Sequence, residues 1–145
     1  MMNSTRGHGR CPARSARVLI RRGVLIDVRP RVAPIVVEVI IAAQTIWAKE
    51  VELYSAPEDV AAPDAAMQHA ISGEWFAFVK SGPFDFEIFC DTAEELTRYA
   101  QDRKLRGAEI PCGELEGRRR ELSADGKEPR FRCRRRWMLS TYYKR

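Results

Sequence analysis

Four arginines near the carboxyl end of the chain are the residues best suited to chemistry. Arg132, Arg134 and Arg136 alternate with apolar residues over residues 131–139, and Arg135 interrupts the apolar half of the pattern. A guanidinium is always charged and presents a planar fork of N–H donors that matches carboxylate and phosphate oxygens. The four side chains therefore form a candidate anion-binding site. Pairing with acids of the same chain is the alternative, and we favour it.

The cysteines and histidines lack the spacing of a metal site. The four cysteines, at positions 11, 90, 112 and 133, include no Cys-x-x-Cys pair. His8 lies in a segment that we expect to be irregular, and His69 has no second ligand at helical spacing. We expect free cysteines that pack as small hydrophobic residues. We also expect no catalytic, cofactor-binding or metal-binding residue in the isolated chain.

The alternation over residues 131–139 predicts a strand with one buried face. The residues on that face are Phe131, Cys133, Trp137 and Leu139. Arg135 falls on the same face, where an unpaired guanidinium would cost several kcal/mol of a total stability of roughly 5 to 15 kcal/mol. We therefore predict that Arg135 reaches an opening at the rim or meets an acid. The candidate acids are Asp85, Glu87 and Glu38.

Apolar runs in the first half of the chain predict strands. We expect a short helix over residues 13–22, then a strand at 24–28 that is apolar on both faces and therefore central in a sheet. Residues 35–41 and 45–53 are rich in β-branched residues and closely linked. They predict an antiparallel hairpin with a β-bulge near Lys49.

Three helices are predicted further along. A capping-box pattern at residues 55–58 predicts the start of a helix that reaches about Ser72. Pro63 either kinks this helix or marks its true start. Residues 92–104 follow a doubled capping box and predict the second helix, with Leu96, Tyr99 and Ala100 on its core face. Residues 112–122 predict a third, polar helix.

Two aromatic runs lie between the first and second helices. Residues 75–79 and 84–89 predict two strands, because residues 81–83 have the turn composition Ser-Gly-Pro. In the second run, apolar residues alternate with Asp85 and Glu87, so one face should be buried and the other wet. The buried residues would be Phe84, Phe86 and Ile88.

These elements predict an α+β protein. We expect a mixed, mostly antiparallel sheet of about five to six strands with two to three helices. The length of 145 residues fits one domain, which we place at residues 13–145, after a basic irregular tail at 1–12. No apolar run is long enough to span a membrane, so we expect no membrane contact and a cytoplasmic location.

Charge is segregated along the chain. Residues 1–31 hold eight arginines and one acid, and residues 117–145 hold eleven basic residues and three acids. The middle, residues 32–116, holds sixteen acids against six basic residues. Basic ends can neutralise the phosphates of nucleic acid or another polyanion, or they can fold against the acidic middle without a partner. We favour the second interpretation.

Residues 17–30, with the sequence RVLIRRGVLIDVRP, resemble the entry to the fifth strand of class I S-adenosylmethionine-dependent methyltransferases. In that family a helix ends in Leu-x-Pro-Gly-Gly and an apolar strand follows at once. Arg21 and Arg22 stand where Pro-Gly is usual. The later order is also similar: an insertion, a phenylalanine-rich strand, a helix with a Ser/Thr-x-x-Glu start, and a final strand ending in Tyr142-Tyr143.

The resemblance implies the C-terminal portion of such an enzyme, which completes the sheet and helps to shape the acceptor pocket. The family binds its cofactor through a glycine-rich turn after the first strand and an acid at the end of the second. Neither has a counterpart in this sequence. The resemblance therefore implies a subunit or remnant that is not catalytic alone. It would bind S-adenosylmethionine only if another protein chain completed the fold.

Two other functions stay open. The Arg-rich ends are typical of a nucleic-acid or polyanion-binding module. A small-ligand-binding α+β domain is the second alternative, because apolar pockets and apolar cores look alike in a sequence. Its pocket would be lined by Trp47, Trp75, Phe86 and Trp137.

Overall fold

The structure is a computed structural model that describes residues 19–54, 57–103 and 105–145. The tail predicted at residues 1–12 and most of the helix predicted at 13–22 lie outside the described residues. The described end of that helix, residues 19–22, forms a bend and a turn.

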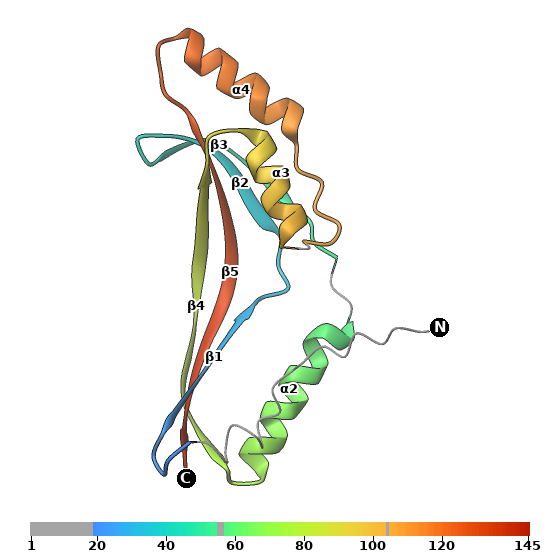
Figure 1. The fold of residues 1–145 in the computed structure, drawn as a ribbon, viewed down its shortest axis with the longest axis vertical. Helices are drawn as coiled ribbons and strands as arrows, with labels where there is room; N and C mark the ends of the chain where they lie inside the picture. Colours follow the sequence, from blue (N-terminus) through green and yellow to red (C-terminus); the bar gives the residue numbers. More distant parts are fainter. Residues whose placement is uncertain (1–18, 55–56, 104) are drawn as a thin grey trace, which may run out of the picture. The chain divides into compact units, whose positions relative to one another are not determined.

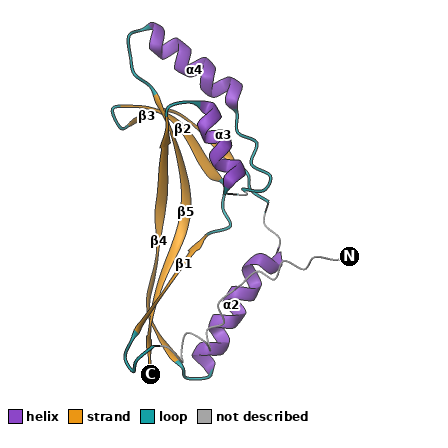
Figure 2. Ribbon diagram, in the orientation of Figure 1, coloured by secondary structure: helices purple, strands orange, loops and turns teal. Residues whose placement is uncertain are grey.

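Five strands and three helices make up the described part of the chain (Figures 1 and 2). In chain order they are β1 (Val24–Pro30), β2 (Ile35–Ile41), β3 (Gln44–Val51), α2 (Pro57–Ser72), β4 (Phe76–Cys90), α3 (Ala93–Asp102), α4 (Cys112–Ala124) and β5 (Arg130–Lys144). The strands form one sheet in the order β1-β5-β2-β3, with β4 also paired to β5. β2 is antiparallel to both β3 and β5. The predicted α+β class with an antiparallel sheet is confirmed.

The chain divides into two compact units. Of the described residues, the first unit comprises 19–28, 57–82 and 139–145, and the second comprises 29–54, 83–103 and 105–138. β4 and β5 are long enough, at 15 residues each, to contribute to both units.

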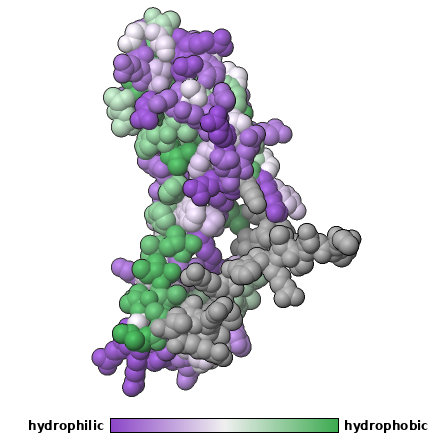
Figure 3. All heavy atoms as spheres, viewed as in Figure 1, coloured by the Kyte–Doolittle hydropathy of each residue, from purple (hydrophilic) through white to green (hydrophobic). Residues whose placement is uncertain are grey.

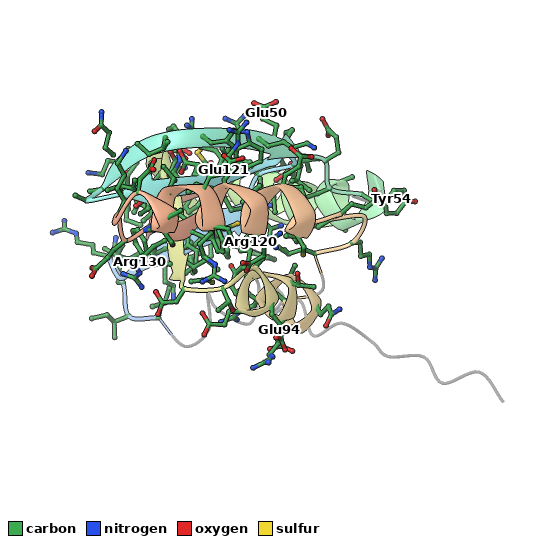
Figure 4. The ribbon with its side chains drawn as sticks, turned by 90° about the horizontal axis from the view of Figure 1, so that it is seen from above. Glu50, Tyr54, Glu94, Arg120, Glu121 and Arg130 are labelled. Atoms are coloured by element: carbon green, nitrogen blue, oxygen red, sulfur yellow. The ribbon has the colours of Figure 1, made fainter. Side chains whose placement is uncertain are left out.

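The core of the second unit lies between the sheet and two helices. α3 and α4 lie on the same side of the sheet (Figures 1 and 4). Their buried residues pack against alternate residues of β2 and β5, as the two-residue period of a strand requires. The fully buried members are Ile35, Val37, Val39, Leu96, Leu115 and Phe131. Each such side chain contributes about 1.5 to 3 kcal/mol through burial.

α3 begins where the sequence predicts. The Thr92 side chain accepts a hydrogen bond from the backbone N–H of Glu95, and the Glu95 carboxylate accepts one from the backbone N–H of Asp91. These contacts satisfy donors that the first turn of a helix leaves free. Leu96 is fully buried, so the predicted core face is confirmed. The helix predicted at residues 112–122 is confirmed as α4.

The predicted hairpin is confirmed as β2 and β3. Its turn has two residues, Ala42 and Ala43, which both have positive φ, as the tight turns favoured in hairpins require. The bulge is not near Lys49. The register shifts between Val39 and Ile40, which leaves Ile46 of β3 without an opposite residue.

β1 corrects the prediction of a central strand buried on both faces. It stands at the end of the strand order, and its residues alternate between exposed and half-buried. An apolar run indicates that a strand can be buried, but it does not indicate how many strands pair with it. In the described sheet, β1 pairs with β5.

β4 corrects the prediction of two strands separated by a turn. It is one strand that runs through Ser81, Gly82 and Pro83. Proline lacks a backbone donor and is tolerated on edge strands, and β4 pairs with β5 alone in the described sheet. Phe84 and Phe86, expected to be buried, are exposed.

The first unit has its own small core. α2 is one helix that continues through Pro63, so a start at Pro63 is wrong. Met67 and Ala70 are buried, and Ile71 packs against them. The other buried members are Phe76 and Tyr142.

Candidate functional site

β5 places the four candidate arginines on two faces. Because side chains of a strand alternate, Arg132, Arg134 and Arg136 share one face of the sheet, and Arg135 points to the other with Cys133. α3 and α4 cover the face that carries Cys133. The first three arginines are therefore on the face opposite the two helices.

Glu38 on β2 is the centre of the charged face. It is 1% exposed, although it stands in an otherwise apolar strand. The register places it opposite Arg132, and Arg134 lies two residues along β5. Its carboxylate accepts from Arg132 Nε at 2.6 Å and from Arg134 Nε at 2.9 Å, and each guanidinium donates a second bond. Thr45 Oγ1 donates to it at 3.0 Å.

These donors determine the ionisation of Glu38. Burial acts to raise the pKa of the carboxyl, but the hydrogen bonds from Arg132, Arg134 and Thr45 outweigh it. The pKa of Glu38 therefore lies below its ordinary value, and the carboxylate is charged at neutral pH. The same contacts raise the pKa of Arg132.

β4 adds two acids to the same face. Asp85 accepts from Arg136 Nε at 2.6 Å and lies 3.7 Å from Arg134 Nη1. Glu87 lies 3.7 Å from Arg132 Nη1. We call these six side chains the arginine ladder. Its members are Arg132, Arg134, Arg136, Glu38, Asp85 and Glu87.

The arginine ladder carries three positive and three negative charges, so its net charge is zero. Pairing of these three arginines with the acidic middle of the chain is confirmed. A neutral, internally paired surface does not present the uncompensated charge that attracts a polyanion. A pocket of about 490 Å³ is lined by Asp85, Arg134 and Arg136 of the ladder and, beyond the ladder, by Arg31 and Glu50.

Arg135 does not meet any of the acids predicted for it. Glu38, Asp85 and Glu87 lie on the opposite face of the sheet, where they pair with the neighbouring arginines. Arg135 lies instead over the ring of Trp137, 5.8 Å from the ring centroid. Burial lowers its pKa.

Comparison with protein-family models, curated proteins and solved structures finds no match to this chain.

The residues proposed for a ligand pocket are separated. Trp47 packs against the core of the second unit, whereas Trp75 contacts His69 in the first. Phe86 and Trp137 come together, with ring centroids 5.9 Å apart.

The cysteines that the structure describes are free thiols. Burial raises the pKa of Cys133 to about 12, so its thiol is protonated at neutral pH. Burial raises the pKa of Cys90 as well. Within the described ranges, no three His, Cys, Asp or Glu residues are grouped closely enough to hold a metal ion. The helices of the same ranges are too short or too polar to traverse a bilayer.

Proposed function

We propose that this chain is a subunit without catalysis of its own, which completes the β-sheet of another protein chain through the open edge of β1. The observation that carries the proposal is an edge strand whose outward-facing residues are all apolar and exposed. The resemblance of residues 17–30 to class I methyltransferases supplies the kind of partner, a chain that holds the cofactor-binding half.

Backbone hydrogen bonds define which edge of β1 is unpaired within the described residues. Lys144 donates to the Gly23 carbonyl at 2.8 Å, and Arg31 donates to the Arg136 carbonyl at 2.9 Å. Both pairs have the same antiparallel register, so the odd-numbered residues of β1 bond to β5. In an antiparallel ladder the intervening residues direct their N–H and C=O groups away from that partner. These outward residues are Val24, Ile26, Val28 and, at the end of the strand, Pro30.

The side chains of the outward residues are exposed too. Val24, Ile26 and Val28 are 59%, 58% and 45% exposed. Figure 3 shows hydrophobic side chains gathered over this part of the sheet. Edge strands are usually protected by lysine, by proline, by a bulge or by short length. Pro30 ends β1, but Val24, Ile26 and Val28 are uncharged and keep their backbone N–H groups. Covering each would contribute roughly 1 kcal/mol, about half of the value for full burial.

The best-supported occupant of this edge is therefore an apolar strand of the partner chain. Main-chain hydrogen bonds would supply affinity, and the alternate side chains would supply specificity. In the family that the sequence resembles, the C-terminal portion completes the sheet of the cofactor-binding half. S-adenosylmethionine would then bind to the assembly rather than to this chain.

The experiment is co-expression with the product of the reading frame upstream of this gene, if that frame encodes a glycine-rich cofactor-binding half. We expect the two chains to copurify and the complex to bind S-adenosylmethionine by titration calorimetry. The isolated chain should show no binding. Ile26→Lys should abolish copurification because it places a charge on the open edge. Ile46→Lys, at another exposed apolar position, is the matched control and should not.

Three results would contradict the proposal. The first is tight binding of S-adenosylmethionine by the isolated chain. The second is a complex that Ile26→Lys leaves intact. The third is an upstream frame that encodes no glycine-rich half.

A further inference from the structure

The face of β5 that carries Cys133 continues beyond the helix-covered core of the second unit. Phe131 and Cys133 are buried beneath α3 and α4, whereas Arg135 and Trp137, further along the strand, are only half-buried. This continuation holds a charged group and an indole that the arginine ladder does not use.

Two neighbouring donors on this face lack acceptors. The Nε of Arg135 and the Nε1 of Trp137 are both buried without a hydrogen-bond partner. A buried donor left unsatisfied destabilises the fold, and more so when it is charged. Such groups are few in native proteins, and an unfilled ligand site is one explanation for them. Arg135 as a whole is half-buried.

Among the described residues, no carboxylate acts on Arg135. The groups that act on Arg135 are Tyr99 and Cys133, and burial raises the pKa of both, so both are neutral at pH 7. The contact with the Trp137 ring stabilises the cation through the negative face of the aromatic ring. The indole ring has no oxygen that could accept a hydrogen bond from Arg135 Nε or Trp137 Nε1.

An aromatic surface lies next to the two donors. The Trp137 ring contacts Phe84 and Phe86, with centroids at 6.5 Å and 5.9 Å. Phe84 is 38% exposed and Phe86 is 43% exposed. A flat apolar group can pack against these rings while an attached anion reaches Arg135.

We propose that Arg135, Trp137, Phe84 and Phe86 form a binding site for a small aromatic carboxylic acid. One carboxylate oxygen would accept from the guanidinium and the other from the indole N–H, while the ring of the ligand would pack on the phenylalanines. A single guanidinium balances a monoanion and matches the planar carboxylate better than a doubly charged phosphate. The site uses no residue of β1, so its test is separate from that of the proposed partner.

The test is 1H–15N NMR of the full-length chain, whose three tryptophans give three indole N–H signals. The variant Trp137→Phe identifies the Trp137 signal by its loss. Titration with sodium benzoate should shift that signal to saturation in the millimolar range, without shifting those of Trp47 and Trp75. Benzyl alcohol and acetate, which lack the anion or the ring, should each bind at least about tenfold more weakly.

Variants then test the guanidinium. Arg135→Gln should abolish saturable binding of benzoate, and Arg135→Met, which keeps the aliphatic stem, should do the same. Arg120→Gln is the charge-matched control, because Arg120 is an exposed residue of α4. The Trp47 and Trp75 signals report whether each variant is folded. Benzoate binding that survives Arg135→Gln, a non-saturating shift, or tighter binding of inorganic phosphate than of benzoate would overturn the proposal.

Discussion

Glu38→Gln tests the arginine ladder most directly. The amide has nearly the shape of the carboxylate, but it removes the charge and replaces one acceptor oxygen by a donor. That donor would face Arg132 and Arg134, which can only donate. We expect a folded but less stable protein.

The magnitude follows from burial. The Glu38 side chain is 2% exposed and that of Arg132 is 15% exposed, so this pair counts as buried. Removing one partner of a buried ion pair costs about 3 to 5 kcal/mol. Arg134 is 33% exposed and adds less. We take the lower end because glutamine keeps one acceptor, which gives a loss of about 3 kcal/mol at pH 7.

Urea unfolding followed by far-UV circular dichroism measures this loss. With an m-value of about 2 kcal/mol per molar urea, the midpoint should fall by about 1.5 M. The pKa of Glu38 is lowered in the folded state, so its stabilisation is present above the unfolded pKa, near 4.5. It is lost as the pH falls through the folded value. The difference between the two proteins should therefore shrink below pH 4.5.

The control is Glu121→Gln. Glu121 on α4 pairs with Arg118 at 3.5 Å, and its side chain is 71% exposed. Loss of such a surface pair should change stability by less than about 0.5 kcal/mol. A Glu38→Gln protein as stable as the Glu121→Gln control at pH 7 would refute the reasoning, as would a difference that persists unchanged at pH 3.

Three further changes test other parts of the fold. Replacing Ala42 by Asn and Ala43 by Gly should raise the free energy of unfolding by about 1 kcal/mol, because both positions have positive φ; an unchanged melting temperature would contradict this. Thr92→Ala should lower it by about 1 kcal/mol through loss of the helix cap, while Thr92→Ser stays near the wild type. Cys133, with a pKa of about 12, should react with iodoacetamide far more slowly than the half-buried Cys112 at pH 8, as measured by peptide mapping.

Elements with strong local signals were predictable from the sequence. The cap at Thr92, the alternation over residues 131–139 and the two β-branched runs of the hairpin each depend on residues close in sequence. The cap acts through backbone groups of its own turn, and the two-residue period requires only that one face of the strand be buried. α3, β5 and the β2–β3 pair therefore appear where they were expected.

Positions in the sheet were not predictable in this way. The apolar run of β1 is compatible with a central or an edge strand, because the number of neighbours is decided by the rest of the fold. Residues 81–83 have turn composition, yet pairing with β5 keeps them extended within β4. A proline such as Pro83 is compatible with a strand that has one open edge.

The sequence by itself determined that three arginines share a face of β5 and that a fourth, Arg135, lies on the other. That follows from the two-residue period of a strand. Only the tertiary structure decided the partners. The register of β2 places Glu38 opposite Arg132, and pairing with β4 brings Asp85 to Arg136. Because these acids reach the same face, Arg135 is left with no carboxylate, which alternation alone cannot reveal.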